Sequence, residues 1–232
     1  MNREAENAAL LLVGLSIGMI AVTGAFTRYV KPSLLGWLLC AAVALIAFGL
    51  ATIIGDARER PTDHGHDHRH RARIGWLLAV PIVVLIFVVP PALGAGAATP
   101  TVMAVSTDVL HRPFPPLPAE RSPVVSLPNV LERVANDTAG TLDHRLITVT
   151  GFVLQDHGST YLARVVIICC AADAQLARIR LSGPPLAQAS ALRNDSWLSA
   201  EGVVLPASPP TMEVSELTRI QPPANTYAYY NS

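Results

Sequence analysis

Three long runs of uncharged, apolar residues constrain this chain more than any other feature. They cover residues 8–26, 34–55 and 74–98, and none of them contains Asp, Glu, Lys, Arg or His. Each run is long enough to cross about 30 Å of hydrocarbon as an α-helix. We therefore expect a membrane protein with three N-terminal transmembrane α-helices, in a transmembrane domain that covers residues 1–98.

The overall composition limits the classes of function. Hydrophobic residues make up 51% of the chain and charged residues only 15%, which is too apolar for an ordinary soluble domain. The formal net charge is zero, so no basic excess is present to neutralise the phosphates of a nucleic acid. Ion pathways through a membrane usually need ionisable groups. Spans without charges therefore predict contact with lipid and an accessory role, not a complete transporter.

The distribution of basic residues predicts an orientation. The loop 56–73 contains five arginines, whereas the turn 28–33 contains one Arg and one Lys. Basic loops stay in the cytoplasm, which places the loop 56–73 and the N-terminus there. With three spans, everything after residue 98 would lie outside the cytoplasm.

Gly14 and Gly18 in the first run have the spacing that lets two helices approach closely. We expect them to pack against the second helix of the same chain. Association with a helix of another protein is the alternative.

A histidine-rich segment occupies the loop between the second and third runs. In an extended chain every second side chain lies on the same side. Neutral imidazoles bind Zn²⁺, Cu²⁺ and Ni²⁺, and carboxylates can complete the coordination shell. We expect weak or transient capture of a metal such as Zn²⁺ here, and the alternative is a solvated polar loop without a tight site. The candidate ligands are Asp63, His64, His66, Asp67, His68 and His70.

The C-terminal half predicts a separate, mainly-β domain over residues 122–232. A proline-rich segment, 99–121, precedes it and predicts a semi-extended linker. Residues 129–136 predict a short helix with a proline near its first turn. A small, partly open OB-like β-barrel of the α+β class fits this pattern, with a β-sandwich as the alternative. The predicted strands cover residues 146–154, 160–170, 177–181, 197–205 and 211–220.

Two adjacent cysteines, Cys169 and Cys170, end the second predicted strand. With Cys40 the chain has three cysteines, which is too few for a disulfide framework. Neighbouring side chains in a strand point to opposite faces, so we expect one buried thiol and one accessible thiol.

A thiolate site is the alternative interpretation of this pair. Asp173, His157 or His144 would then join the cysteines. In either case Asp173 lies in the turn after the strand, where we expect its side chain to hydrogen-bond the local backbone.

Motifs of known catalytic sites are missing from the sequence. It contains no phosphate-binding glycine loop, no GxSxG and no HExxH. We therefore expect no catalytic residues and no enzyme activity. The alternative is an extracytoplasmic thiol, redox or metal-binding protein centred on Cys169 and Cys170.

The run Cys169-Cys170-Ala171-Ala172-Asp173-Ala174 is the most specific motif of the chain. Together with residues 147–153, Ala163-Arg164, Trp197, the apolar runs and the His-rich loop, it resembles the YcgQ-like family of two-component permease subunits. The resemblance implies a membrane-anchored accessory subunit in the plasma membrane of a bacterium, with a polytopic permease as its partner. It also implies a link to zinc supply, and it implies no catalytic residue.

Overall fold

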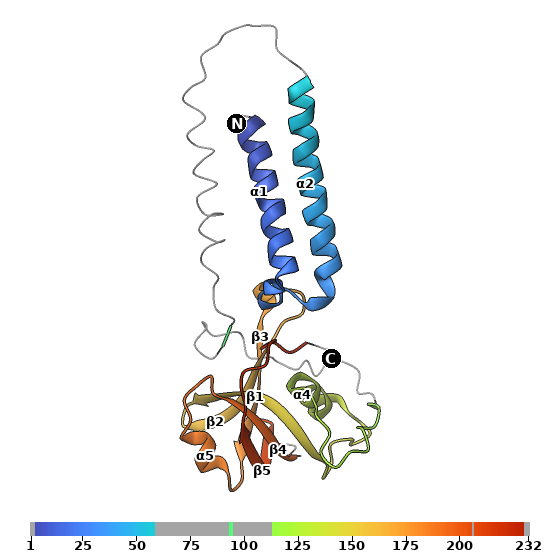
Figure 1. The fold of residues 1–232 in the computed structure, drawn as a ribbon. Helices are drawn as coiled ribbons and strands as arrows, with labels where there is room; N and C mark the ends of the chain where they lie inside the picture. The colour runs from blue at the N-terminus through green and yellow to red at the C-terminus, as the bar shows by residue number, and fades with distance from the viewer. Residues whose placement is uncertain (1–2, 59–92, 95–112, 206, 230–232) are drawn as a thin grey trace. The chain divides into compact units, whose positions relative to one another are not determined.

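The computed structural model describes residues 3–58, 93–94, 113–205 and 207–229 (Figure 1). The chain divides into two compact units, Met1–Pro91 and Ala92–Ser232. The described part of the first unit is helical, and the described part of the second unit is mainly β-structure.

The first unit contains a hairpin of two helices, α1 (Arg3–Val22) and α2 (Leu35–Arg58), which run side by side (Figure 1). Two short 3-10 turns connect them, η1 (Ala25–Arg28) and η2 (Pro32–Leu34). Gly24 has a φ of 75°, a left-handed conformation that glycine adopts without strain. The chain therefore leaves α1 before this glycine.

Small residues bring the two helices of the hairpin close together. A Cβ on Gly14 would lie 2.8 Å from Cγ1 of Ile46 and 3.2 Å from the carbonyl oxygen of Ala42. A Cβ on Gly18 would lie 3.9 Å from Cβ of Ala42. The prediction that these glycines pack against the second helix of the same chain is confirmed.

The prediction of three transmembrane helices is wrong for the described part of the chain. One helical stretch there, Pro32–Gly55, is long and apolar enough to cross a membrane, with 24 residues and a mean hydropathy of 2.5. A signal sequence near an N-terminus has a similar character. The apolar part of α1, Asn7–Val22, is shorter, because the helix ends before the last residues of the apolar run. Of the predicted span 74–98, only residues 93–94 are described.

The second unit contains five strands that form one closed barrel. Neighbouring strands pair in the order β1-β2-β3-β5-β4, and β4 pairs with β1 to close the barrel. All pairs are antiparallel except β3 and β5, which are parallel. The strands overlap the segments predicted from the sequence, but the barrel is closed and not partly open, and it is not a sandwich. The strands are β1 (Leu146–Asp156), β2 (Ser159–Val166), β3 (Gln175–Ser182), β4 (Trp197–Leu205) and β5 (Thr211–Arg219).

The main hydrophobic core lies inside this barrel and under the helix α4 (Leu127–Asn136). Buried and half-buried side chains alternate along the first half of β1, which is the pattern of a strand with one face toward a core. A second, very short helix, α5 (Leu186–Ser190), follows β3. Fully buried members of the core include Val130, Ile147, Val149, Leu162, Ile179 and Met212.

A second apolar cluster covers the opposite face of β2. Val165 and Ile167 belong to it, whereas Val166 between them belongs to the main core. The apolar run 165–168 is therefore buried on both faces, as predicted, up to Ile167. Ile168 departs from this pattern, with 53% of its surface exposed. The other buried members of the second cluster are Phe152, Ala163, Leu176, Trp197 and Tyr227.

Gly202 allows β4 and β5 to approach at an irregular point of the barrel. The register shifts between Glu201 and Gly202, and a Cβ on Gly202 would overlap the carbonyl oxygen of Glu213. We predict that Gly202→Ala lowers the free energy of unfolding by about 1–3 kcal/mol, because the backbone must move to admit the methyl group. Urea denaturation of the full-length protein in detergent, followed by near-ultraviolet circular dichroism, measures this change.

Ser199→Ala in the same strand is the matched control for this substitution. Ser199 is half-buried and pairs with Thr218 of β5 in the regular part of the ladder, before the register shift. We expect this control to change the free energy of unfolding by less than about 0.5 kcal/mol. Equal effects of the two substitutions would contradict the importance of the close approach.

Candidate functional site

The loop of residues 167–174, the Cys loop, joins β2 to β3. Its first N–H group, that of Ile167, donates to the carbonyl oxygen of Ala228 in the C-terminal tail at 3.2 Å. Its second half forms a 3-10 turn, η3 (Ala171–Asp173), with Cys170 at the N-cap position. Both ends of the loop are therefore held by backbone structure.

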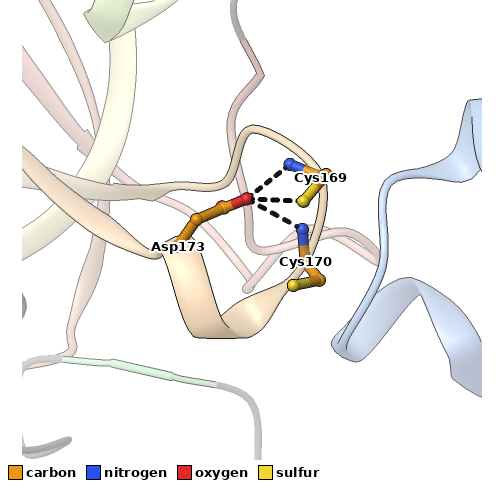
Figure 2. A group of neighbouring side chains, drawn as sticks. All are labelled: Cys169, Cys170 and Asp173. Carbon is orange, nitrogen blue, oxygen red and sulfur yellow. Dashed lines mark hydrogen bonds between the residues drawn. The ribbon is translucent and has the colours of Figure 1, made fainter.

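The carboxylate of Asp173 organises the remainder of the Cys loop (Figure 2). Oδ1 accepts a hydrogen bond from the N–H of Ile168 at 2.7 Å. Oδ2 accepts the N–H of Cys169 at 2.8 Å, the N–H of Cys170 at 3.2 Å and the thiol of Cys169 at 2.8 Å. The sulfur of Cys170 in turn accepts the N–H of Asp173. The prediction that Asp173 hydrogen-bonds the local backbone is confirmed.

These hydrogen bonds shift two pKa values in opposite directions. Partial burial alone would raise the pKa of Asp173, but the bonds from the Cys169 thiol and three backbone N–H groups lower it to about 2. The same bond to Asp173, together with a bond to Cys170, raises the pKa of the Cys169 thiol to about 11. At neutral pH, Asp173 is therefore ionised and Cys169 is protonated.

The loop gathers three potential metal ligands. The sulfur atoms of Cys169 and Cys170 and a carboxylate oxygen of Asp173 all lie within 4.8 Å of one another. In a tetrahedral site with Zn–S bonds of about 2.3 Å, two sulfur ligands lie about 3.8 Å apart. The three atoms are thus near the spacing of a zinc site, and an incoming metal would displace the thiol protons.

The same electrostatics weigh against a reactive thiol. Nucleophilic and redox-active cysteines have a lowered pKa, because the thiolate is the reacting species. The ionised Asp173 does the opposite to Cys169, since its negative charge and its hydrogen bond both favour the protonated thiol. The arrangement therefore suits metal binding better than nucleophilic or redox chemistry.

The prediction that the two thiols point to opposite faces of a strand, with one of them buried, is wrong. Cys169 is exposed and Cys170 is half-buried. The physical reason is that β2 ends at Val166, so the alternation of a strand does not reach the cysteines. The chain bends instead to bring its N–H groups to Asp173.

The other predicted ligands do not join this cluster. His144 and His157 lie in turns, with φ values of 53° and 45°, and Nε2 of His157 is 3.5 Å from Oδ1 of Asp156. The third cysteine, Cys40, was not a predicted ligand and is exposed on α2, in the other unit. Metal binding by the His-rich segment stays a prediction, because its candidate ligands lie outside the described residues. They are Asp63, His64, His66, Asp67, His68 and His70.

Sequence reasoning missed the role of Arg164, which fastens the C-terminal tail next to the Cys loop. Its Nη2 donates to the carbonyl oxygens of Asn225 at 3.1 Å and Tyr227 at 3.3 Å. Its Nη1 donates to Oγ1 of Thr150 at 2.9 Å, and its guanidinium lies 5.0 Å from the ring centroid of Trp197. Burial lowers the pKa of Arg164. The available signal was a single arginine, the one charged residue of β2, with two apolar residues on either side of it.

One comparison with known proteins identifies a relationship for the second unit. A family model described as the DUF1980 C-terminal domain matches residues 128–230. The match covers the barrel strands, the Cys loop and most of the tail, and it is consistent with a member of this uncharacterised family. No curated protein matches the chain.

We predict that Asp173→Asn lowers the pKa of the Cys169 thiol from about 11 toward the ordinary cysteine range. The reason is that the amide keeps a hydrogen-bond acceptor but removes the negative charge that opposes thiolate formation. Peptide-resolved alkylation of the full-length protein between pH 7 and pH 10 measures the change. The alkylation rate of Cys169 in the variant should pass its midpoint within this range, whereas in the unsubstituted protein it should still be rising at pH 10. We expect at least a tenfold faster reaction at pH 8, because each pKa unit is about a tenfold change in thiolate fraction.

Asp143→Asn is the matched control, because Asp143 is exposed and lies in the turn before β1. It should leave the alkylation profile of Cys169 unchanged. An unchanged profile in the Asp173 variant would show that Asp173 does not set the protonation of this thiol.

Proposed function

We propose that the barrel domain captures a zinc ion at the Cys loop, through the thiolates of Cys169 and Cys170 and the carboxylate of Asp173. The observation that carries this proposal is the convergence of these three side chains on one surface loop, with ligand atoms within 4.8 Å of one another. Zinc accepts both thiolate and carboxylate ligands. Two thiolates alone would also suit Cu(I), but the harder carboxylate favours Zn²⁺.

The proposed role is non-enzymatic. The protonated Cys169 supports it, because a thiol with a pKa of about 11 is a poor nucleophile at neutral pH. A bound metal ion stabilises the thiolate form of Cys169, because its positive charge replaces the thiol proton. Cys169 can thereby serve as a metal ligand without being a reactive thiolate when the metal is absent.

The first experiment is a titration of the reduced full-length protein in detergent with Co²⁺, whose thiolate bonds give a near-ultraviolet charge-transfer band. We expect one Co²⁺ per chain, displaced by Zn²⁺, and a loss of the band in Cys169→Ser and Cys170→Ser. Asp173→Asn should weaken binding at least tenfold, since it removes one ligand. The affinity should rise about tenfold per pH unit for each proton displaced between pH 6 and pH 8.

Two matched variants make this titration specific. Cys40→Ser should leave the band unchanged, because Cys40 lies on α2 and not in the Cys loop. Replacing all four histidines of the His-rich segment with alanine removes competing imidazoles, and the thiolate band should remain. A chain without a thiolate band at saturating Co²⁺ would refute the proposal. The four positions are His64, His66, His68 and His70.

A second proposal is that the chain serves as an accessory subunit of a polytopic permease and links metal capture to transport. The helical hairpin supports it, because large apolar side chains lie exposed on α1 and α2 and need lipid or another helix to cover them. The resemblance to two-component permease subunits supports it independently. An extracytoplasmic barrel stays a prediction, because it depends on the segment 74–98. Among the exposed side chains are Leu15, Met19, Trp37, Val43 and Phe48.

We predict that a polytopic membrane protein co-purifies with the affinity-tagged chain from its native membrane in mild detergent. Mass spectrometry identifies this partner. The double variant Trp37→Ala and Val43→Ala should lower its recovery about fivefold or more, because it removes apolar contact area from α2. The control is Val124→Ala on the barrel unit, where the side chain is 72% exposed. Recovery of the chain without any polytopic protein would refute this role.

A further inference from the structure

The proposed zinc site has an open coordination position. Among the described residues, the Cys loop brings together three ligand atoms, from Cys169, Cys170 and Asp173, and no fourth. Zinc in proteins is usually four-coordinate, and sites with three protein ligands keep the fourth position for water or another molecule. The identity of the group that fills this fourth position rests on the proposed function, the capture of zinc at the Cys loop.

The open position faces outward. Cys169 is exposed and Cys170 is only half-buried, so a metal held between their sulfur atoms lies at the surface of the barrel domain. Figure 2 shows both sulfur atoms and the carboxylate on one tight turn of the chain. A second protein can therefore reach the metal without any opening of the fold.

The Cys loop cannot supply the missing ligand by folding over the metal. The N–H groups of three successive residues, Ile168, Cys169 and Cys170, are bonded to Asp173. The residue before them, Ile167, is bonded to the tail through its own N–H. These bonds fix the backbone of the loop, so the loop itself does not supply a fourth ligand, and among the described residues no other side chain joins the three.

The exposed side chain of Ile168 indicates which kind of molecule supplies the fourth ligand. Its three predecessors in the apolar run are buried, but 53% of its own surface is exposed, and it directly precedes Cys169 in the chain. A water molecule or a small anion gains nothing from an apolar neighbour, whereas a polypeptide with apolar side chains buries area against it. The exposed isoleucine therefore favours a protein ligand.

We propose that the Cys loop passes its zinc directly to a second protein, which presents a cysteine flanked by apolar side chains. The incoming thiol loses its proton to solvent, and its thiolate binds zinc at the open position. The bonds from zinc to Cys169, Cys170 and Asp173 then break in turn as further ligands of the second protein replace them. The two thiolates each take a proton from solvent, and the Asp173 carboxylate stays ionised. No oxidation state changes, and the metal keeps protein ligands throughout the exchange.

The test uses the full-length protein in detergent, loaded with Co²⁺ and reduced with a phosphine. The probes are two capped tripeptides, Leu-Cys-Leu and Ser-Cys-Ser. We expect the thiolate–cobalt band to grow by about half with either peptide, because two thiolate ligands become three. Leu-Cys-Leu should bind about fivefold more tightly, as expected for roughly 40 Å² of additional buried apolar surface.

Ile168→Ser is the decisive variant, since it keeps the backbone N–H that Asp173 binds and removes the exposed apolar side chain. It should abolish the preference for Leu-Cys-Leu, whereas Val124→Ser, on another exposed apolar side chain, should keep it. Equal affinities for the two peptides in the unsubstituted protein would overturn the role of Ile168.

The kinetics of metal release give an independent readout. With Zn²⁺ bound and a chromophoric chelator in excess, direct transfer predicts a release rate that rises linearly with the concentration of Leu-Cys-Leu. A rate independent of the peptide, or a cobalt band that does not grow, would overturn the transfer proposal and leave zinc capture standing. A protein with no thiolate–cobalt band at all would overturn both.

Discussion

The conformation and the chemistry of the Cys loop depend on one ionised carboxylate. Asp173 accepts three backbone N–H groups and one thiol, and this uses the lone-pair directions that a carboxylate offers. Bonds to a charged acceptor are stronger than neutral ones, so the loop is held firmly without a covalent link. The proposed metal binding would replace only the thiol bond and leave the three backbone bonds in place. In that proposal, Asp173 both holds the loop and serves as a metal ligand.

The strands of the barrel are predictable from the sequence where they keep the period of two. Residues 177–181 alternate apolar and basic side chains, and β3 follows that pattern in the structure. Hydropathy alone does not show where elements end. The apolar run 8–26 continues past the point where Gly24 turns the chain, and the run 165–168 continues past the end of β2. Both errors arise because composition says nothing about the hydrogen bonds that terminate an element.

Only part of the candidate site is predictable in the same way. The proximity of Asp173 to the cysteines follows from a short separation in sequence and the known tendency of aspartate to bond nearby backbone. The contacts of the tail are not predictable in this way. Ile167 bonds to Ala228, and Arg164 bonds to Tyr227, and in each pair the two residues are far apart in the sequence. Such contacts exist only after the barrel has closed, so no local pattern records them.

The tail also brings the two ends of the barrel domain together. The N–H of Leu93, near the start of the second unit, donates to the phenolic oxygen of Tyr227, near its end, at 3.0 Å. A domain whose termini are adjacent can be inserted into a loop of another protein or circularly permuted with little disturbance of its core. The barrel, with its Cys loop, is therefore suited to attachment to a different anchor without redesign of the fold.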